Sequence, residues 1–149
     1  MAWQVRDPAY AERVRESFAK QAFMATLGAS LGPVEPGEVV IELPVREALT
    51  QQHGFVHAGA LASVLDSAAG YAAFTLMPPG AAVLSIEFKL NLLEPARGER
   101  IVARGRVVRS GRTINVCRAD AVAFASGRET LVATLQGTMM CVEGRGIRD

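Results

Sequence analysis

Cysteine is scarce in this 149-residue chain, and the two that occur, Cys117 and Cys141, form no CxxC pair and lie near no histidine cluster. Their spacing argues against a zinc site and a disulfide scaffold, so we expect two buried free thiols. A formal net charge of +1 excludes the strongly positive surface that is typical of nucleic-acid-binding proteins. Residues 1–18 carry charge throughout and lack the apolar stretch of a secretory signal, which predicts a cytoplasmic protein.

Lysine is scarce as well, because Lys20 and Lys89 are the only two and arginine supplies the rest of the basic charge. Arginine suits bidentate contacts to phosphate, so its abundance in the second half of the chain hints at a phosphorylated ligand. Half of the residues are apolar, which is enough for one continuous core. We therefore expect a single domain over residues 1–149, with an N-terminal helical segment at 1–28.

The longest apolar run covers residues 57–76, where small and aliphatic side chains surround one ionisable residue, Asp66. Such a composition favours a helix, and a helix that is apolar nearly all round has to be buried on nearly all sides. A length of about 20 residues would also suit a membrane span. Because Asp66 near the midpoint would cost roughly 2.5–3.5 kcal/mol in a bilayer, we predict a buried central helix instead.

The segments before this run predict a helix followed by a hairpin. Asp7-Pro8 favours a helix start with aspartate as the N-cap and proline at the first helical position, and Gly28 is the expected helix end. Apolar residues recur at every fourth position between them, as on one face of a helix. A Pro36-Gly37 turn then separates two short runs, which indicate a hairpin over residues 30–45.

The segments after the central run predict strands. Pro78-Pro79-Gly80 ends the helix, because proline removes a donor and restricts the residue before it. In the first strand-like run, leucine, isoleucine and phenylalanine alternate with polar residues, a period-2 pattern that places one face inward and the other toward water. Turn-rich joints between the runs predict an antiparallel meander. The four runs cover residues 82–93, 100–109, 113–125 and 130–142.

These elements predict an α+β fold, in which a curved antiparallel sheet wraps around one long central helix and an N-terminal helix precedes them. The order of elements resembles the hotdog fold over nearly the whole chain. The helix then supplies the cover that the inner face of the sheet needs.

Particular residues strengthen that resemblance. Gln51, followed by His57-Ala58-Gly59 and then by Leu65-Asp66 and Gly70, resembles the signature of the acyl-CoA thioesterases of the hotdog, or 4-hydroxybenzoyl-CoA thioesterase, superfamily. The spacing from the histidine to the acidic residue is similar to that of the phenylacetate-catabolism (PaaI-like) group. Residues 87–95 resemble that family's strand ending in proline, and Gly111-Arg112-Thr113 resembles its coenzyme A-contacting turn.

Asp66 is the residue most in need of explanation, because a carboxylate in a buried apolar helix has to be paired, protonated or functional. The structural explanation is an ion pair with an arginine such as Arg104 or Arg106. In the functional explanation, which the family resemblance favours, Asp66 is the general base that activates water or the nucleophile that attacks the thioester carbonyl. The sequence does not decide between these two roles.

His57 precedes the helix and would on its own be a structural cap, but the resemblance places it beside the thioester, where it orients the carbonyl or holds the helix terminus. The amides of Ala58 and Gly59 are expected to be free donors at the positive end of the helix dipole, able to stabilise an oxyanion and contact substrate. Ala58 replaces the first glycine of the family's H-G-G motif. Gln51 matches the position at which the family holds the water or the carbonyl.

The spacing of these residues implies more than one subunit. Nine residues of helix separate His57 from Asp66 by about 13 Å, too far for both to touch one carbonyl in the same chain. The family arrangement implies a symmetric homodimer in which Gln51 and His57 of one chain face Asp66 of the other, assembled further into a tetramer. For the coenzyme A end, Gly111-Arg112-Thr113 offers backbone amides and a guanidinium to a phosphate.

The sequence thus predicts an enzyme, an acyl-CoA thioesterase that hydrolyses an aromatic or aliphatic acyl-CoA to the free acid and coenzyme A. We expect no metal or redox cofactor, and neither nucleic acid nor membrane as a partner. A non-catalytic acyl-CoA-binding module with the same fold is the alternative. A hydratase is disfavoured, because the Asp-His pair that such enzymes carry is not found. The residues expected to line the acyl pocket are Leu61, Leu65, Phe74 and Phe88.

Overall fold

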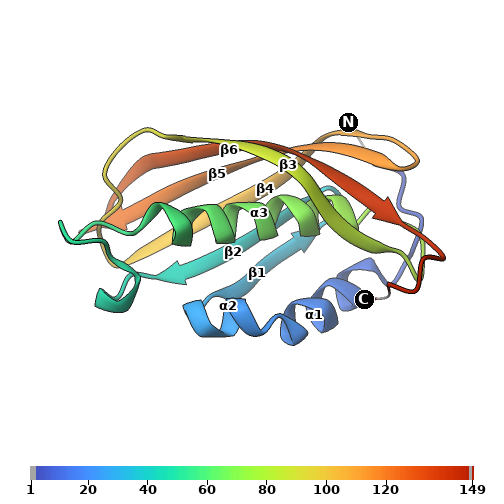
Figure 1. Ribbon diagram of the computed structural model, residues 1–149, viewed down its shortest axis with the longest axis horizontal. Helices are drawn as coiled ribbons and strands as arrows, with labels where there is room; N and C mark the ends of the chain where they lie inside the picture. Colours follow the sequence, from blue (N-terminus) through green and yellow to red (C-terminus); the bar gives the residue numbers. More distant parts are fainter. Residues whose placement is uncertain (1–2, 148) are drawn as a thin grey trace.

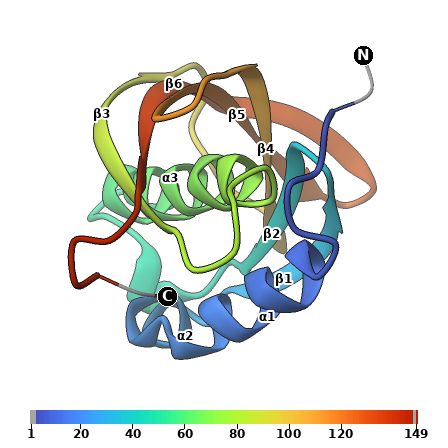
Figure 2. The same cartoon turned by 90° about the vertical axis from the view of Figure 1, so that its right-hand side faces the viewer.

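One long helix, α3 (Ala58–Phe74), lies along the inner face of a six-stranded antiparallel sheet in the computed structural model, which describes residues 3–147 and 149 (Figure 1). The sheet curls around this helix, as the second view shows (Figure 2). The predicted α+β hotdog arrangement is therefore confirmed. The other helices are α1 (Tyr10–Lys20), α2 (Ala22–Leu27) and the short 3-10 helix η1 (Glu47–Leu49). The strands in their order across the sheet are β1 (Ser30–Glu35), β2 (Glu38–Pro44), β4 (Arg100–Ser110), β5 (Ile114–Ala125), β6 (Arg128–Val142) and β3 (Ala82–Leu92).

The small side chains of α3 let it lie directly on the sheet. Every residue from Ala68 to Phe74 is buried. A Cβ added to Gly105 on β4 would lie 2.1 Å from the carbonyl oxygen of Ala68, so only glycine allows the helix backbone to approach this closely. The prediction of a buried central helix is confirmed. In the described part of the chain, residues 3–147 and 149, no helix has both the length and the apolar character to cross a membrane.

The strand order corrects the predicted meander. Strands β4, β5 and β6 are consecutive antiparallel neighbours, but β3 pairs with β6 at the edge of the sheet and β4 pairs with β2. The segment between β3 and β4 is therefore a crossover past the start of α3, where the Val56 N–H donates to the Ala96 carbonyl at 2.8 Å. Its proline and glycine content is equally compatible with a hairpin turn, which is why the sequence pattern misled.

The alternation predicted for residues 82–93 is also wrong in part. A register shift between Ser85 and Glu87 marks a β-bulge, which interrupts the period-2 pattern. The apolar side chains along this edge strand are largely exposed instead of facing the core. This apolar strip, hereafter the β3 strip, consists of Leu84 (45% exposed), Ile86 (53%), Phe88 (42%), Leu92 (55%) and Leu93 (48%).

The N-terminal helical segment is broken once. Gln21, with an extended ψ of 90°, separates α1 from α2. The N-cap of α1 is Ala9 and not Asp7, because the Asp7 carboxylate accepts from the Ala9 N–H at 2.9 Å in the turn before the helix and pairs with Arg13 at 3.2 Å. Gly28 ends α2 with a left-handed φ of 76°, as predicted.

Arg13 fixes α1 to the C-terminal end of α3. Its guanidinium donates to the carbonyls of Phe74 (3.0 Å), Met77 (2.9 Å) and Pro78 (2.6 Å), and it lies 4.3 Å from the centroid of the Phe74 ring. Carbonyls at a helix C-terminus lack partners within the helix and carry the negative end of its dipole, so a cation there stabilises the terminus. The N-terminal helices are thereby held beside the second half of α3.

The two cysteines are buried free thiols, as predicted. Burial raises the pKa of Cys117 to about 12. Because the thiolate is the reactive form, Cys117 is expected to be inert at neutral pH.

Candidate functional site

Asp66 lies on the side of α3 that faces β3, and its Oδ1 accepts a hydrogen bond from the Ser85 hydroxyl at 2.7 Å. Arg106 pairs with Asp120 at 3.0 Å, and among the ion pairs of the described residues none joins Asp66 to Arg104 or Arg106. The structural explanation of Asp66 as an arginine partner is therefore wrong. Burial raises the pKa of Asp66, and the hydrogen bond from Ser85 opposes that rise. Such a carboxylate is a stronger base than an ordinary aspartate.

Ser85 is a site residue that the sequence pattern did not reveal. The alternation assigned it to the water-facing side of the strand, and the bulge that follows it was not visible in the pattern. Its hydroxyl also lies 3.3 Å from the sulfur of Met139, but the single proton goes to the stronger acceptor, Asp66. The one available hint was an isolated hydroxyl in the apolar stretch 81–86.

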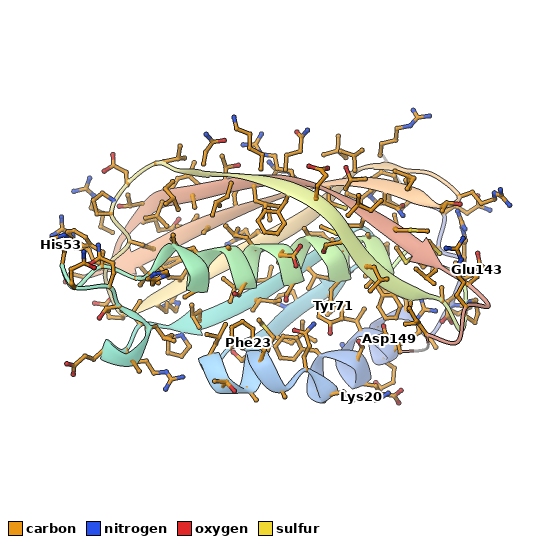
Figure 3. The ribbon with its side chains drawn as sticks, in the orientation of Figure 1. Lys20, Phe23, His53, Tyr71, Glu143 and Asp149 are labelled. Atoms are coloured by element: carbon orange, nitrogen blue, oxygen red, sulfur yellow. The ribbon has the colours of Figure 1, made fainter. Side chains whose placement is uncertain are left out.

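A cavity of about 570 Å³ lies beside Asp66, between α1, α3 and β3. We call it the Asp66 cavity. Its volume is in the range typical of small-molecule sites. Figure 3 shows Tyr71 between α3 and α1, and this side chain forms part of the wall. The lining includes Ser17, Gln21, Asp66, Ser67, Gly70 and Tyr71.

A second cavity, of about 410 Å³, lies at the N-terminal end of α3, and we call it the His57 cavity. It brings together Gln51, His57 and Ala58, three of the residues that the sequence singled out. Apolar side chains from α3 and from the end of β3 complete the wall. These are Leu61, Leu92 and Leu93.

His57 is the N-cap of α3, with its Nδ1 accepting from the Gly59 N–H at 2.8 Å. This bond corrects the expectation that the Gly59 amide is free. The Ala58 amide, in contrast, has no acceptor among the described residues. A neutral imidazole that accepts at Nδ1 carries its proton on Nε2, so the ring offers a second donor at this end of the helix.

Gln51 is held in the loop before α3. Its side-chain oxygen accepts from the His53 N–H, and its own N–H donates to the Phe55 carbonyl at 2.8 Å. With the oxygen engaged, the side-chain NH₂ group is the part that remains to contact a ligand in the His57 cavity. His53, for which the sequence suggested no role, lies at the exposed tip of this loop (Figure 3).

The chain does not bring the two groups of residues together. Gln51, His57 and Ala58 line one cavity and Asp66 lines the other, and nine residues of helix separate them by about 13 Å. One subunit therefore has helix-terminal donors in one cavity and a carboxylate in the other.

The Gly111-Arg112-Thr113 turn joins β4 to β5 at the Asp66 end of the sheet, because Met140 pairs with both Ile114 and Leu84. One of its three amides is engaged, because the Gly111 N–H donates to the Ile114 carbonyl (2.9 Å), and the Thr113 carbonyl accepts from the Cys141 N–H (2.7 Å). Arg112 is exposed and lines neither the Asp66 cavity nor the His57 cavity. The turn thus offers a side chain to a phosphate, and fewer free amides than expected.

Only one of the apolar residues expected in the acyl pocket lines either cavity. Leu61 lies in the wall of the His57 cavity. Leu65 and Phe74 are completely buried in the core, whereas Phe88 belongs to the exposed β3 strip. The expectation is wrong for Leu65 and Phe74, because they lie on the core-facing side of α3, whereas Phe88 lies on β3 outside both cavities.

Comparison with known proteins gives matches over most of the chain. Residues 53–128 match the sequence model of the Thioesterase superfamily. A solved thioesterase family protein from Silicibacter pomeroyi is 54% identical with a TM-score of 0.89, covering 91% of this chain and 99% of that one. Acyl-coenzyme A thioesterase 13 of Homo sapiens is 30% identical over 94 residues, 62% of this chain and 66% of that protein. The E. coli PaaI protein from the phenylacetic acid degradation operon shares the fold, with a TM-score of 0.82 at 20% identity, covering 91% of this chain and 94% of that one.

Proposed function

Since the chain belongs to the thioesterase superfamily, we propose that it hydrolyses an acyl-CoA to a free acid and coenzyme A, at a site that two subunits share. The observation that carries this proposal is Asp66, a half-buried carboxylate with a raised pKa, bonded to Ser85 in the wall of a ligand-sized cavity. Carboxylates in such surroundings collect at functional sites. The acyl-coenzyme A thioesterase among its relatives supports the choice of substrate.

The β3 strip supports a homodimer. Five large apolar side chains are exposed along one sheet edge, and an edge strand also presents unpaired backbone groups. Val83 to Ser85 border the Asp66 cavity, and Leu92 and Leu93 border the His57 cavity, so both half-sites lie along the same strand. Antiparallel pairing of two β3 strands about a two-fold axis would place the Asp66 cavity of each subunit against the His57 cavity of the other.

In this dimer the reaction divides between the two subunits. Asp66 takes a proton from water as the water oxygen bonds to the thioester carbon, and Ser85 holds the carboxylate in place. The oxyanion that forms accepts hydrogen bonds from the Ala58 amide and the Nε2–H of His57 of the other subunit, at the positive end of the α3 dipole. The carbon–sulfur bond then breaks, and the proton passes from Asp66 to the departing thiolate.

In a second role, an oxygen of Asp66 attacks the thioester carbon, the coenzyme A thiolate leaves, and water then hydrolyses the mixed anhydride by attacking the Asp66 carbonyl. A single turnover in ¹⁸O-labelled water separates the two roles. As a base, Asp66 leaves one labelled oxygen in the product acid. As a nucleophile, it leaves an unlabelled product in the first turnover and carries the label itself.

For the coenzyme A end, Arg112 with Thr113 is the proposed contact to a phosphate of the nucleotide, since Arg112 is exposed beside the sheet end that carries Asp66. The contact would lie far from the reacting carbon. It should therefore contribute to binding in the ground and transition states equally.

The decisive experiment measures release of free thiol from a panel of aromatic and aliphatic acyl-CoAs, together with the mass of the protein in solution. We expect turnover by the wild type and a dimer or a pair of dimers. Tight binding of acyl-CoA without thiol release from any member of the panel would contradict the hydrolase and indicate a binding module. A monomer with full activity would contradict the shared site.

A further inference from the structure

Two hydroxyl groups that the proposed reaction does not use lie in the wall of the Asp66 cavity. Ser17 on α1 and Tyr71 on α3 have their oxygens 3.1 Å apart and are only 7% and 3% exposed. The Tyr71 ring packs against Phe18 and Phe74, with centroids 6.0 and 6.3 Å away. Alanine at position 17 and phenylalanine at position 71 would pack equally well, so packing does not explain the two hydroxyl groups.

The Ser17 and Tyr71 hydroxyls can form more hydrogen bonds than the one that joins them. Two hydroxyls carry two protons and four lone pairs, and their one mutual bond uses a single proton and a single lone pair. One O–H and several lone pairs are thus left without a partner among the described residues. Buried polar groups normally have partners, and here the cavity is the place from which a ligand can supply them.

Gly70, next to Tyr71, leaves space in the same cavity. Glycine weakens the interior of a helix relative to alanine. Nothing in the protein requires it here, because a Cβ built on Gly70 would meet no atom within 4 Å. The absent methyl group therefore keeps volume open beside Asp66, one turn away on the same face of α3.

We propose that the acyl group occupies the Asp66 cavity against Gly70, and that the Ser17–Tyr71 pair selects acyl groups with a hydroxyl at their far end. This inference rests on the proposed function, because it places the thioester at Asp66. From Asp66 to Tyr71 is about 7.5 Å along the helix axis, which suits a single ring or a short chain. Val83 and Leu84 form an apolar wall for the hydrocarbon part.

The test compares kcat/KM for pairs of acyl-CoAs that differ only in the terminal hydroxyl, such as a ring acyl with and without a para hydroxyl. The wild type should prefer the hydroxylated member by roughly 3- to 10-fold, the value of one net hydrogen bond. Tyr71→Phe should bring this ratio close to one. Ser17→Ala should also lower the ratio, and it tests the pair by itself if Tyr71→Phe does not fold. Tyr10→Phe is the matched control, because Tyr10 packs against the core outside this cavity and should leave the ratio unchanged.

Gly70→Ala tests the placement of the acyl group. The added methyl should lower kcat/KM for ring acyl-CoAs by about 10-fold or more relative to acetyl-CoA, because a pocket discriminates a group of this size to that extent. The helix should be no less stable than in the wild type. An equal effect on acetyl-CoA and ring acyl-CoAs would overturn the placement.

Selection and hydrolysis fail in different ways. Turnover with no hydroxyl preference, and no change of ratio in Tyr71→Phe, would overturn the selection and leave the hydrolase standing. If no acyl-CoA is hydrolysed, the proposed function fails, and calorimetric binding of the paired acyl-CoAs decides the inference. A binding preference for the hydroxylated member that Tyr71→Phe abolishes would support it, and equal affinities would overturn it.

Discussion

The two ends of α3 differ in whether their backbone polar groups have hydrogen-bond partners within the protein. At the C-terminal end the residues are buried, and Arg13 donates to three carbonyls at and beyond the last turn. At the N-terminal end Gly59 is exposed, and the Ala58 amide has no acceptor among the described residues. Both ends of any helix carry polar groups that need partners. This protein satisfies the C-terminal end with its own arginine, and at the N-terminal end it leaves the Ala58 amide for the proposed contact with substrate.

Asp66→Asn should have the largest effect, because it leaves the donors at the N-terminal end of α3 with no carboxylate to act with. We expect kcat to fall by about 10²–10⁴-fold or more, since the swap keeps the shape and removes the ionisable group. Asp120→Asn is the matched control, because it removes a hydrogen-bonded carboxylate that lies outside both cavities. Full activity of Asp66→Asn in a thiol-release assay would rule out the assigned role.

The same variant has a second expected effect, on stability. Burial raises the pKa of Asp66, so the folded protein binds this proton more tightly than the unfolded chain does. The free energy of unfolding of the wild type should therefore decrease as pH rises from the ordinary aspartate pKa through the raised one. Asparagine does not ionise, and Asp66→Asn should be the more stable protein above that range. Denaturant unfolding at several pH values measures this difference.

Mixing two inactive variants tests whether the N-terminal end of α3 in one chain works with Asp66 of another. Gln51→Ala and Asp66→Asn should each form largely inactive homodimers. After complete exchange, half of the dimers are mixed and one of their two sites is intact, so about a quarter of wild-type activity should return. Mass tags on the two variants verify exchange. Tagged heterodimers without restored activity would show that Gln51 and Asp66 do not meet across the interface.

Arg13→Ala removes the side chain that bonds the carbonyls at the C-terminal end of α3. Three charge-assisted hydrogen bonds and the contact with the Phe74 ring are lost, and we expect unfolding to become easier by roughly 2–4 kcal/mol. Arg15→Ala is the control, because Arg15 is more than half exposed and its one ion pair among the described residues is with Glu12 on the surface. That change should stay within about 0.5 kcal/mol. Equal losses for the two variants in denaturant unfolding would mean that Arg13 does not fix the terminus.

Arg112→Ala leaves both ends of α3 intact and should affect binding only. We expect KM for acyl-CoA to rise by about 10-fold with kcat nearly unchanged, which is the pattern of a contact equally strong in the ground and transition states. The effect should vanish with acyl-pantetheine substrates, which lack the nucleotide phosphates. The same loss with both substrates would assign Arg112 a structural role.

Ser85→Ala should have the smallest effect, and one that appears mainly in the pH profile. The hydrogen bond from Ser85 lowers the pKa of Asp66 against the larger effect of burial, so its removal should raise that pKa further. Activity requires ionised Asp66, and the acid limb of kcat/KM should move to higher pH by up to about one unit. A profile with an unmoved acid limb would show that Ser85 does not act through Asp66.

Local features of the chain were the ones that the sequence revealed. The alanine-rich run predicted α3, and the half-buried position of Asp66 follows from it. Gly28 was correctly predicted as a helix end, because a left-handed terminus is a property of one residue and its neighbours. The Pro36-Gly37 turn likewise predicted the β1–β2 hairpin.

Features that depend on distant partners were not predictable in this way. The neighbour of β3 is β6, whose residues lie about fifty positions later in the chain, and nothing within either strand specifies this pairing. The β-bulge that follows Ser85 depends on the same pairing, so Ser85 was missed. The bonds of Arg13 reach residues 61 to 65 positions away. The Gly59 amide was expected to be free, because the sequence does not tell which way the His57 ring turns.

The close approach of Gly105 to Ala68 has a consequence for how this protein tolerates change. The height of α3 above the sheet is determined by backbone meeting backbone, two residues from Asp66, and not by the sizes of the surrounding core side chains. Substitutions such as Leu65→Met or Ile101→Val can therefore accumulate at a cost in stability while the helix keeps its distance from the sheet. Core side chains can in this way change while the site geometry is kept. Gly105 is the position at which a change in the core would also change the site geometry.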